Sequence, residues 1–193
     1  RKEHATALDR FKQLAERMPE QSRAGEAHLL AIVNAAALAR AAQGEAQVQQ
    51  MKVYEALLRV QLANWPEDKS TDQARLWLGM LLESRREWLA AWEVYRAVGA
   101  DFLQYEAAMR GALRCAEQSA ARSGPKDVIR FGEELIVGPQ RQWPEKWSPL
   151  QLEAALMVAR LNLYFFHIGH DIKPTQGMLA TAIANSADAP EAW

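Results

Sequence analysis

A short tryptophan–proline motif occurs twice in this chain and constrains the fold more than any other feature. Residues 65–70 read WPEDKS and residues 143–148 read WPEKWS. Pro-Glu also occurs at residues 19–20 and 190–191, and nowhere else in the sequence. Successive pairs lie 47, 78 and 46 positions apart, which fits four units of about 43 residues if the middle interval holds two. A unit of this length accommodates two helices and two turns.

The composition indicates that these units are helical. Val, Ile and Thr, which are favoured in strands, make up only 19 of the 193 residues. Ala, Leu, Glu, Arg, Gln, Lys and Met, which are good helix formers, make up 117. We therefore predict an all-α protein whose sequential helices pack antiparallel across short connections. The Gly, Pro and Ser positions divide it into about nine helices, at 3–18, 22–43, 45–64, 70–84, 86–99, 101–122, 125–137, 148–167 and 174–186.

The predicted helices form one continuous repeat domain, over residues 1–193. The stretch 138–149 holds three prolines and two tryptophans and is the candidate boundary within that domain. The chain starts inside a predicted second helix of a unit, and residues 190–193 resemble the start of a further unit. A solenoid needs terminal units with a polar outer face, and neither end looks like one. We therefore expect the chain to be a fragment of a longer protein.

Charge and hydropathy argue against several kinds of partner. The net charge is −1 and both signs are spread along the chain, so no basic face for nucleic acid is expected. No apolar run approaches the ~18–20 residues that span a bilayer, so we expect no membrane insertion within this segment. Cys115 is the single cysteine, which rules out an intrachain disulfide. The sequence fits the cytoplasm and the bacterial periplasm equally.

Residues 78–98 resemble a tetratricopeptide repeat. The matching positions are Leu78, Gly79, Leu82, Trp88, Ala91, Trp92, Tyr95 and Val98. Residues 7–19 resemble the second half of such a unit, through Ala7, Phe11, Leu14 and Pro19, and the other helix pairs diverge. The resemblance implies a right-handed α-solenoid of antiparallel helix pairs, a TPR-like superhelix. It further implies a non-catalytic scaffold that binds a protein or peptide on its concave helical face.

The same resemblance implies where a partner binds. On the concave side, the predicted helix 70–84 would present Gln73, Leu76, Met80, Glu83 and Ser84. We expect Leu76 and Met80 to grip an apolar side chain and Glu83 to select a cation or an amide. Trp143 and Trp147 are further candidates, because aromatic anchors often mark interfaces, although packing within the loop 138–149 would explain them equally well.

Few residues have the pattern of a chemical site. His167, His170 and Asp171 are spaced so that they could share a metal ion, but Gly169 favours the end of a helix there. We expect Cys115 to be a buried structural residue. We expect Glu133 and Glu134 to lie on a solvated helix face. The chain is accordingly predicted to be no enzyme and to hold no cofactor or metal. The alternatives are a small-molecule sensor with a pocket between units and, less favoured, a metal-dependent module at His167, His170 and Asp171.

Overall fold

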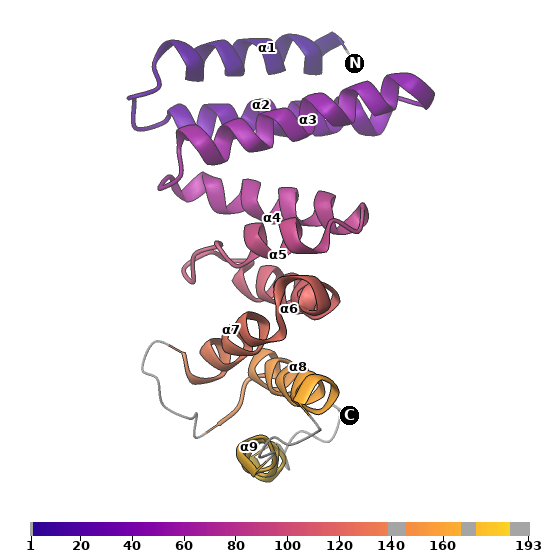
Figure 1. Cartoon of the computed structure of the whole chain (residues 1–193). Coiled ribbons are helices and arrows are strands. Elements are labelled where there is room, and N and C mark those ends of the chain that lie inside the picture. The colour runs from indigo at the N-terminus through magenta and orange to yellow at the C-terminus, as the bar shows by residue number, and fades with distance from the viewer. Residues whose placement is uncertain (1, 139–145, 167–172, 186–193) are drawn as a thin grey trace. The chain divides into compact units, whose positions relative to one another are not determined.

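The computed structural model describes residues 2–138, 146–166 and 173–185, and within these ranges the secondary structure is helices joined by turns and loops, without strands (Figure 1). The nine helices of the described residues are α1 (Lys2–Arg17), α2 (Ala24–Ala41), α3 (Gly44–Asn64), α4 (Lys69–Ser84), α5 (Trp88–Tyr95), α6 (Tyr105–Ser123), α7 (Pro125–Val137), α8 (Pro149–Phe166) and α9 (Lys173–Asn185). The predicted all-α class is therefore confirmed, and most helix boundaries lie within two residues of those expected.

Local capping explains several of these boundaries. At the start of α4, the Asp68 carboxylate accepts a hydrogen bond from the backbone N–H of Ser70 at 2.8 Å. At the start of α8, the backbone N–H of Ser148 donates to the Gln151 side chain at 2.9 Å, while the Ser148 hydroxyl accepts from the Gln151 N–H at 3.3 Å. This reciprocal pair is a capping box. The serines that end the two tryptophan–proline motifs thus lie at helix starts in both cases.

The helices expected at 86–99 and 101–122 are both shorter in the structure. Arg86 has a positive φ of 60°, which is incompatible with a right-handed helix, and α5 begins only at Trp88. After Tyr95 the chain forms consecutive turns, in which the N–H of Phe102 donates to the Gly99 carbonyl and the N–H of Tyr105 donates to the Phe102 carbonyl. The Gly99 N–H also donates to the Asp72 carboxylate of α4 at 3.2 Å. These contacts replace the helical ladder between residues 96 and 104.

The structure divides into two compact units. Unit 1 comprises residues 1–85 and 97–105, and unit 2 comprises residues 86–96 and 106–193. In unit 1, α2 packs against α1, α3 and α4, and α3 also packs against α4. The loops before α2 and before α4 lie at the same end of these helices (Figure 1). There the Trp65 indole donates to the Pro19 carbonyl at 3.1 Å and packs with Ala15, Ala24 and Ala27.

Unit 2 has its own core around α6, α7 and α8. Trp92 of α5 packs edge-to-face on Phe131 of α7, with ring centroids 5.9 Å apart. Gly111 of α6 lies so close to the Tyr95 ring that an added Cβ would be 2.7 Å from it. Cys115 is completely buried in α6, as expected. Among the described helices, none is long and apolar enough to cross a bilayer.

Candidate partner-binding surface

The face of α4 expected to contact a partner is only partly available. Met80 is 55% exposed and Ser84 is exposed, but Leu76 is only 6% exposed and belongs to the core. Gln73 and Glu83 are half-buried. Each four-residue step in a helix rotates a position by about 40°, which separates Leu76 from Met80 across the edge of the buried stripe. The expectation that these two side chains together grip an apolar group is therefore wrong for Leu76.

Of the other predicted site residues, some are buried or exposed in the structure and the rest lie outside the described residues. Trp147 is buried at 9% exposure, just before α8, so its ring is packed in the protein. Trp143, His167, His170 and Asp171 lie outside the described residues. Within the part of the chain that is described, no three His, Cys, Asp or Glu side chains come together as a metal site. Glu133 and Glu134 are exposed on α7, as expected.

Unit 1 has an apolar hollow that the sequence did not reveal, here called the tryptophan hollow. It has a volume of about 360 Å³ and is lined by Val33, Ala36, Ala39 and Arg40 of α2, Met51 and Tyr54 of α3, and Trp77 of α4. Val33 at its rim is 41% exposed. Three helices therefore contribute an apolar wall with one guanidinium and one phenol, which is the usual composition of a binding pocket.

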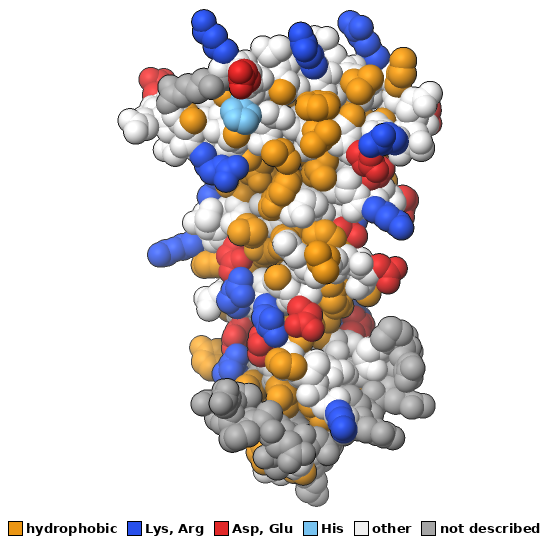
Figure 2. Space-filling model, turned by 180° about the vertical axis from the view of Figure 1, so that it is seen from behind, with side chains coloured by type: hydrophobic (Ala, Val, Ile, Leu, Met, Phe, Trp, Pro, Cys, Tyr) orange, Lys and Arg blue, Asp and Glu red, His pale blue; other side chains and the backbone are white. Residues whose placement is uncertain are grey.

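A second hollow adjoins the first and is here called the α3–α4 hollow. It has a volume of about 610 Å³ and is lined by Gln47, Val48, Met51, Lys52 and Glu55 of α3 together with Leu81, Ser84 and Arg85. Met51 lines both hollows, so they lie next to each other along α3, and the two together are here called the groove. Ser84 is the one predicted site residue that lines this groove. In Figure 2, hydrophobic side chains gather on one face of unit 1, with charged side chains around them.

The titratable groups of the groove have defined charge states. Glu55 binds Arg85 and also Arg59, whose guanidinium lies 2.8 Å from the carboxylate. Partial burial alone would raise the pKa of Glu55, but these hydrogen bonds and charges outweigh it and lower the pKa below its ordinary value. Burial raises the pKa of Tyr54 to about 12, against a smaller opposite effect of Arg40. The Glu55 carboxylate is therefore ionised at neutral pH, and the Tyr54 phenol is neutral.

Near the loop end of unit 1, a buried polar cluster joins α2, α3 and α4. The His28 Nδ1 and the Gln61 Oε1 are 2.8 Å apart. The Gln61 Nε2 donates to the Thr71 hydroxyl at 3.2 Å and, more weakly, to the Gly25 carbonyl at 3.3 Å. The Thr71 hydroxyl donates its own proton to the Trp65 carbonyl, so it can only accept from Gln61. This orients the Gln61 amide and requires that Nδ1 of His28 carries the proton.

The remaining nitrogen of His28 has no hydrogen-bond partner in the part of the chain that the structure describes. His28 is completely buried and stacks against Trp65 with ring centroids 4.9 Å apart, and its Nε2 makes no hydrogen bond. Burial lowers the pKa of His28 below its ordinary value, despite the hydrogen bond to Gln61. Glu16 opposes this shift and Lys12 adds to it. The cluster is sealed from solvent and holds three helices together, which is a structural role.

Unit 2 has a hollow of about 390 Å³ at the start of α5. It is lined by Arg86, Glu87, Trp88, Leu89, Ala90, Gln118, Ser119 and Arg122. Its charged side chains are one carboxylate and two guanidinium groups, and it shares no lining residue with the two hollows of unit 1. Because two hollows adjoin in unit 1, the groove there offers the longer surface and is the stronger candidate for a partner.

Comparisons with known proteins give no relative for this chain, since no family model, no curated protein and no solved structure matches it.

Proposed function

We propose that this chain is a TPR-like helical-repeat scaffold that binds a protein or peptide partner without catalysis, in the groove formed by the two hollows of unit 1. The observation that carries the proposal is that the two hollows adjoin at Met51, which lines both. A segment of polypeptide is long enough to occupy both hollows, whereas one small molecule would fill only the first. Helical grooves with apolar walls commonly bind amphipathic or extended segments in this way.

The packing of unit 1 supports a repeat arrangement. In a helical solenoid, the first helix of each pair packs on its own second helix and on the first helix of the next pair. The α2 helix packs on α3 and on α4 in this manner. The proposal extends this arrangement to a right-handed solenoid of antiparallel pairs over the whole chain.

A peptide selection tests this function. A displayed library of random 12-residue peptides is selected against the purified protein, and the enriched peptides are measured against two variants. Val33→Glu places a charge at the rim of the tryptophan hollow, and Val53→Glu is a matched control on α3 that lines neither hollow. Val33 and Val53 are equally exposed, at 41% and 42%, so both variants should fold.

We expect Val33→Glu to weaken binding of the enriched peptides at least tenfold, because a charge is desolvated in an apolar contact. Val53→Glu should leave binding unchanged. Enriched peptides that bind both variants like the parent protein would contradict the proposed site, as would a selection that yields no peptide.

A small-molecule sensor is the second candidate, and the tryptophan hollow is the observation that favours it. Its volume of about 360 Å³ is within the range of ligand pockets, which is roughly 300–1,000 Å³. Decanoate, an apolar chain with one carboxylate, is a suitable probe. This candidate would be supported if decanoate binds the parent protein and does not bind Val33→Glu.

A further inference from the structure

The charges that line the groove are unequal. Arg40, Lys52 and Arg85 contribute three cations, and Glu55 contributes the single carboxylate of the lining. Glu55 is already held by Arg85 and by Arg59. The groove therefore carries a net positive charge on a chain whose total charge is −1.

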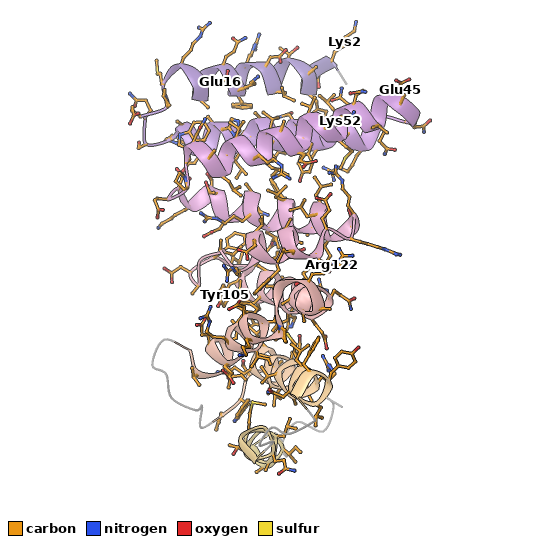
Figure 3. The ribbon with its side chains drawn as sticks, viewed as in Figure 1. Lys2, Glu16, Glu45, Lys52, Tyr105 and Arg122 are labelled. Carbon is orange, nitrogen blue, oxygen red and sulfur yellow. The ribbon has the colours of Figure 1, made fainter. Side chains whose placement is uncertain are left out.

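Two of these cations are not neutralised within unit 1. The Arg40 guanidinium contacts only the Ala36 carbonyl of its own helix, at 3.4 Å, and forms no ion pair with the described residues. Lys52 likewise has no carboxylate partner in the described part of the chain. It lies on the half of α3 that begins near Glu45, away from the loop to α4, as Figure 3 shows. One free cation thus belongs to each hollow.

The tryptophan hollow, which Arg40 lines, has mostly apolar walls. Trp77, Met51 and Val33 form the wall of the tryptophan hollow, and the neutral Tyr54 phenol beside them is a hydrogen-bond donor. A carboxylate that approaches Arg40 can therefore accept from the phenol as well. No acidic side chain lines the tryptophan hollow to oppose it.

We propose that the segment bound in this groove is acidic: a peptide with one large apolar side chain seated in the tryptophan hollow and with Asp or Glu side chains that pair with Arg40 and Lys52. This inference rests on the proposed function, and it specifies the chemistry of the partner. A nucleic acid would require a broad basic field that the chain lacks. A ligand with a single carboxylate would pair with Arg40 and leave Lys52 without a partner.

The peptides enriched in the selection described above supply the test. We expect one Phe, Trp, Leu or Met among several Asp or Glu residues in most of them. The best peptide is then synthesised with a fluorophore, beside a version in which every Asp and Glu is replaced by Asn and Gln. By fluorescence anisotropy, the acidic peptide should bind at least tenfold tighter in 50 mM salt, and the difference should shrink as salt is added.

Charge-removing variants locate the contact. We expect Arg40→Gln and Lys52→Gln each to weaken binding of the acidic peptide about two- to fivefold, the size typical of one partly exposed ion pair. Binding of the amide peptide should be unchanged. Arg10→Gln and Lys69→Gln are the matched controls, because both cations are exposed in unit 1 and line neither hollow. These controls should not affect either peptide.

The outcomes separate the two proposals. The enriched peptides could fail to bind Val33→Glu and yet show no excess of Asp and Glu, or bind equally well in the Asn and Gln version. Either result would contradict an acidic partner and would still support the groove as a peptide-binding site. The selection could instead yield no peptide whose binding depends on Val33, while decanoate binds the parent protein and not Val33→Glu. This result would contradict both the peptide site and the acidic partner, and would assign the tryptophan hollow to a small amphiphile.

Discussion

At the scale of single residues, the stability of unit 1 depends on a few buried polar atoms. Gln61 and Thr71 are completely buried, and each satisfies atoms of another helix or loop. Such groups contribute little when paired but are costly when one partner is lost. The network also determines the tautomer of His28 and leaves its unprotonated Nε2 without a hydrogen-bond donor among the described residues. Protonation of His28 or a substitution in this network should therefore lower the free energy of unfolding more than a substitution at an exposed position.

The buried His28 predicts that acid destabilises the protein. Its pKa is near 6.5 in the unfolded chain and lower in the folded one, so the unfolded state binds the proton first. Stability should be constant above about pH 7 and fall by at most about 1.4 kcal/mol per pH unit below pH 6.5, until the folded pKa is passed. Urea unfolding between pH 5 and 8 measures this dependence.

The control for this prediction is His28→Asn, whose amide N–H can still reach Gln61. The variant should be less stable overall but should lose the part of the pH dependence that His28 supplies. Equal pH slopes in the two proteins would show that other groups cause the effect.

Thr71→Val should destabilise the protein by about 1–3 kcal/mol, because it removes two buried hydrogen bonds of the Thr71 hydroxyl, one to the Trp65 carbonyl and one from Gln61. The Trp65 carbonyl keeps the Asp68 N–H as a partner, and Gln61 keeps the Ser70 hydroxyl and the Gly25 carbonyl. The side-chain volume is nearly unchanged, so packing contributes little. Thr6→Val is the matched control, since the exposed Thr6 hydroxyl bonds only to the Lys2 carbonyl. Equal stabilities of the two variants in urea unfolding would argue against the buried network.

At the scale of elements, close helix contacts depend on small residues. Gly132 of α7 lies against α8, where an added Cβ would be 2.5 Å from Val158 and 2.8 Å from Met157. Gly177 of α9 is the contrasting case, because no atom of the described residues outside its own helix backbone and chain neighbours lies within 4 Å of its added Cβ. The same substitution therefore has opposite expected effects in two helices of one protein.

Gly132→Ala should destabilise the protein by about 1–3 kcal/mol, because the clash with the branched Val158 exceeds the ~1 kcal/mol that alanine gains over glycine in a helix. Gly177→Ala should instead stabilise α9 by up to about 1 kcal/mol, since only the helix propensity changes. Thermal unfolding of both variants measures the difference. Stabilisation by Gly132→Ala would contradict the close α7–α8 contact.

At the scale of the whole molecule, the proposed solenoid predicts an extended particle. A compact domain of 193 residues has a radius of gyration of about 16 Å. Since stacked helix pairs contact only their neighbours, a solenoid of this length should exceed that value clearly. Small-angle X-ray scattering measures the radius directly, and a value close to 16 Å would contradict a solenoid over the whole chain.

The sequence predicted elements better than it predicted the candidate site. The end of α3 before Pro66 and the starts of α7 at Pro125 and of α8 at Pro149 were predictable from the sequence. Proline and its capping neighbours act within one helical turn. The short α5 was not predictable, because the turns after it involve a hydrogen bond from Gly99 to Asp72, 27 positions away. Of the predicted binding residues, only Ser84 lines the groove, and Arg40, Met51 and Tyr54 were missed. No local pattern connects these positions.

The sequence by itself determined that this chain is helical and where most helices begin and end, because composition, capping and proline act over a few neighbouring residues. The tertiary structure alone decided that Leu76 is buried and Met80 exposed, that His28 meets Gln61, and that α2, α3 and α4 enclose a positively charged groove. The physical reason is that burial and electrostatic pairing depend on which helices meet, and these contacts join residues that are tens of positions apart.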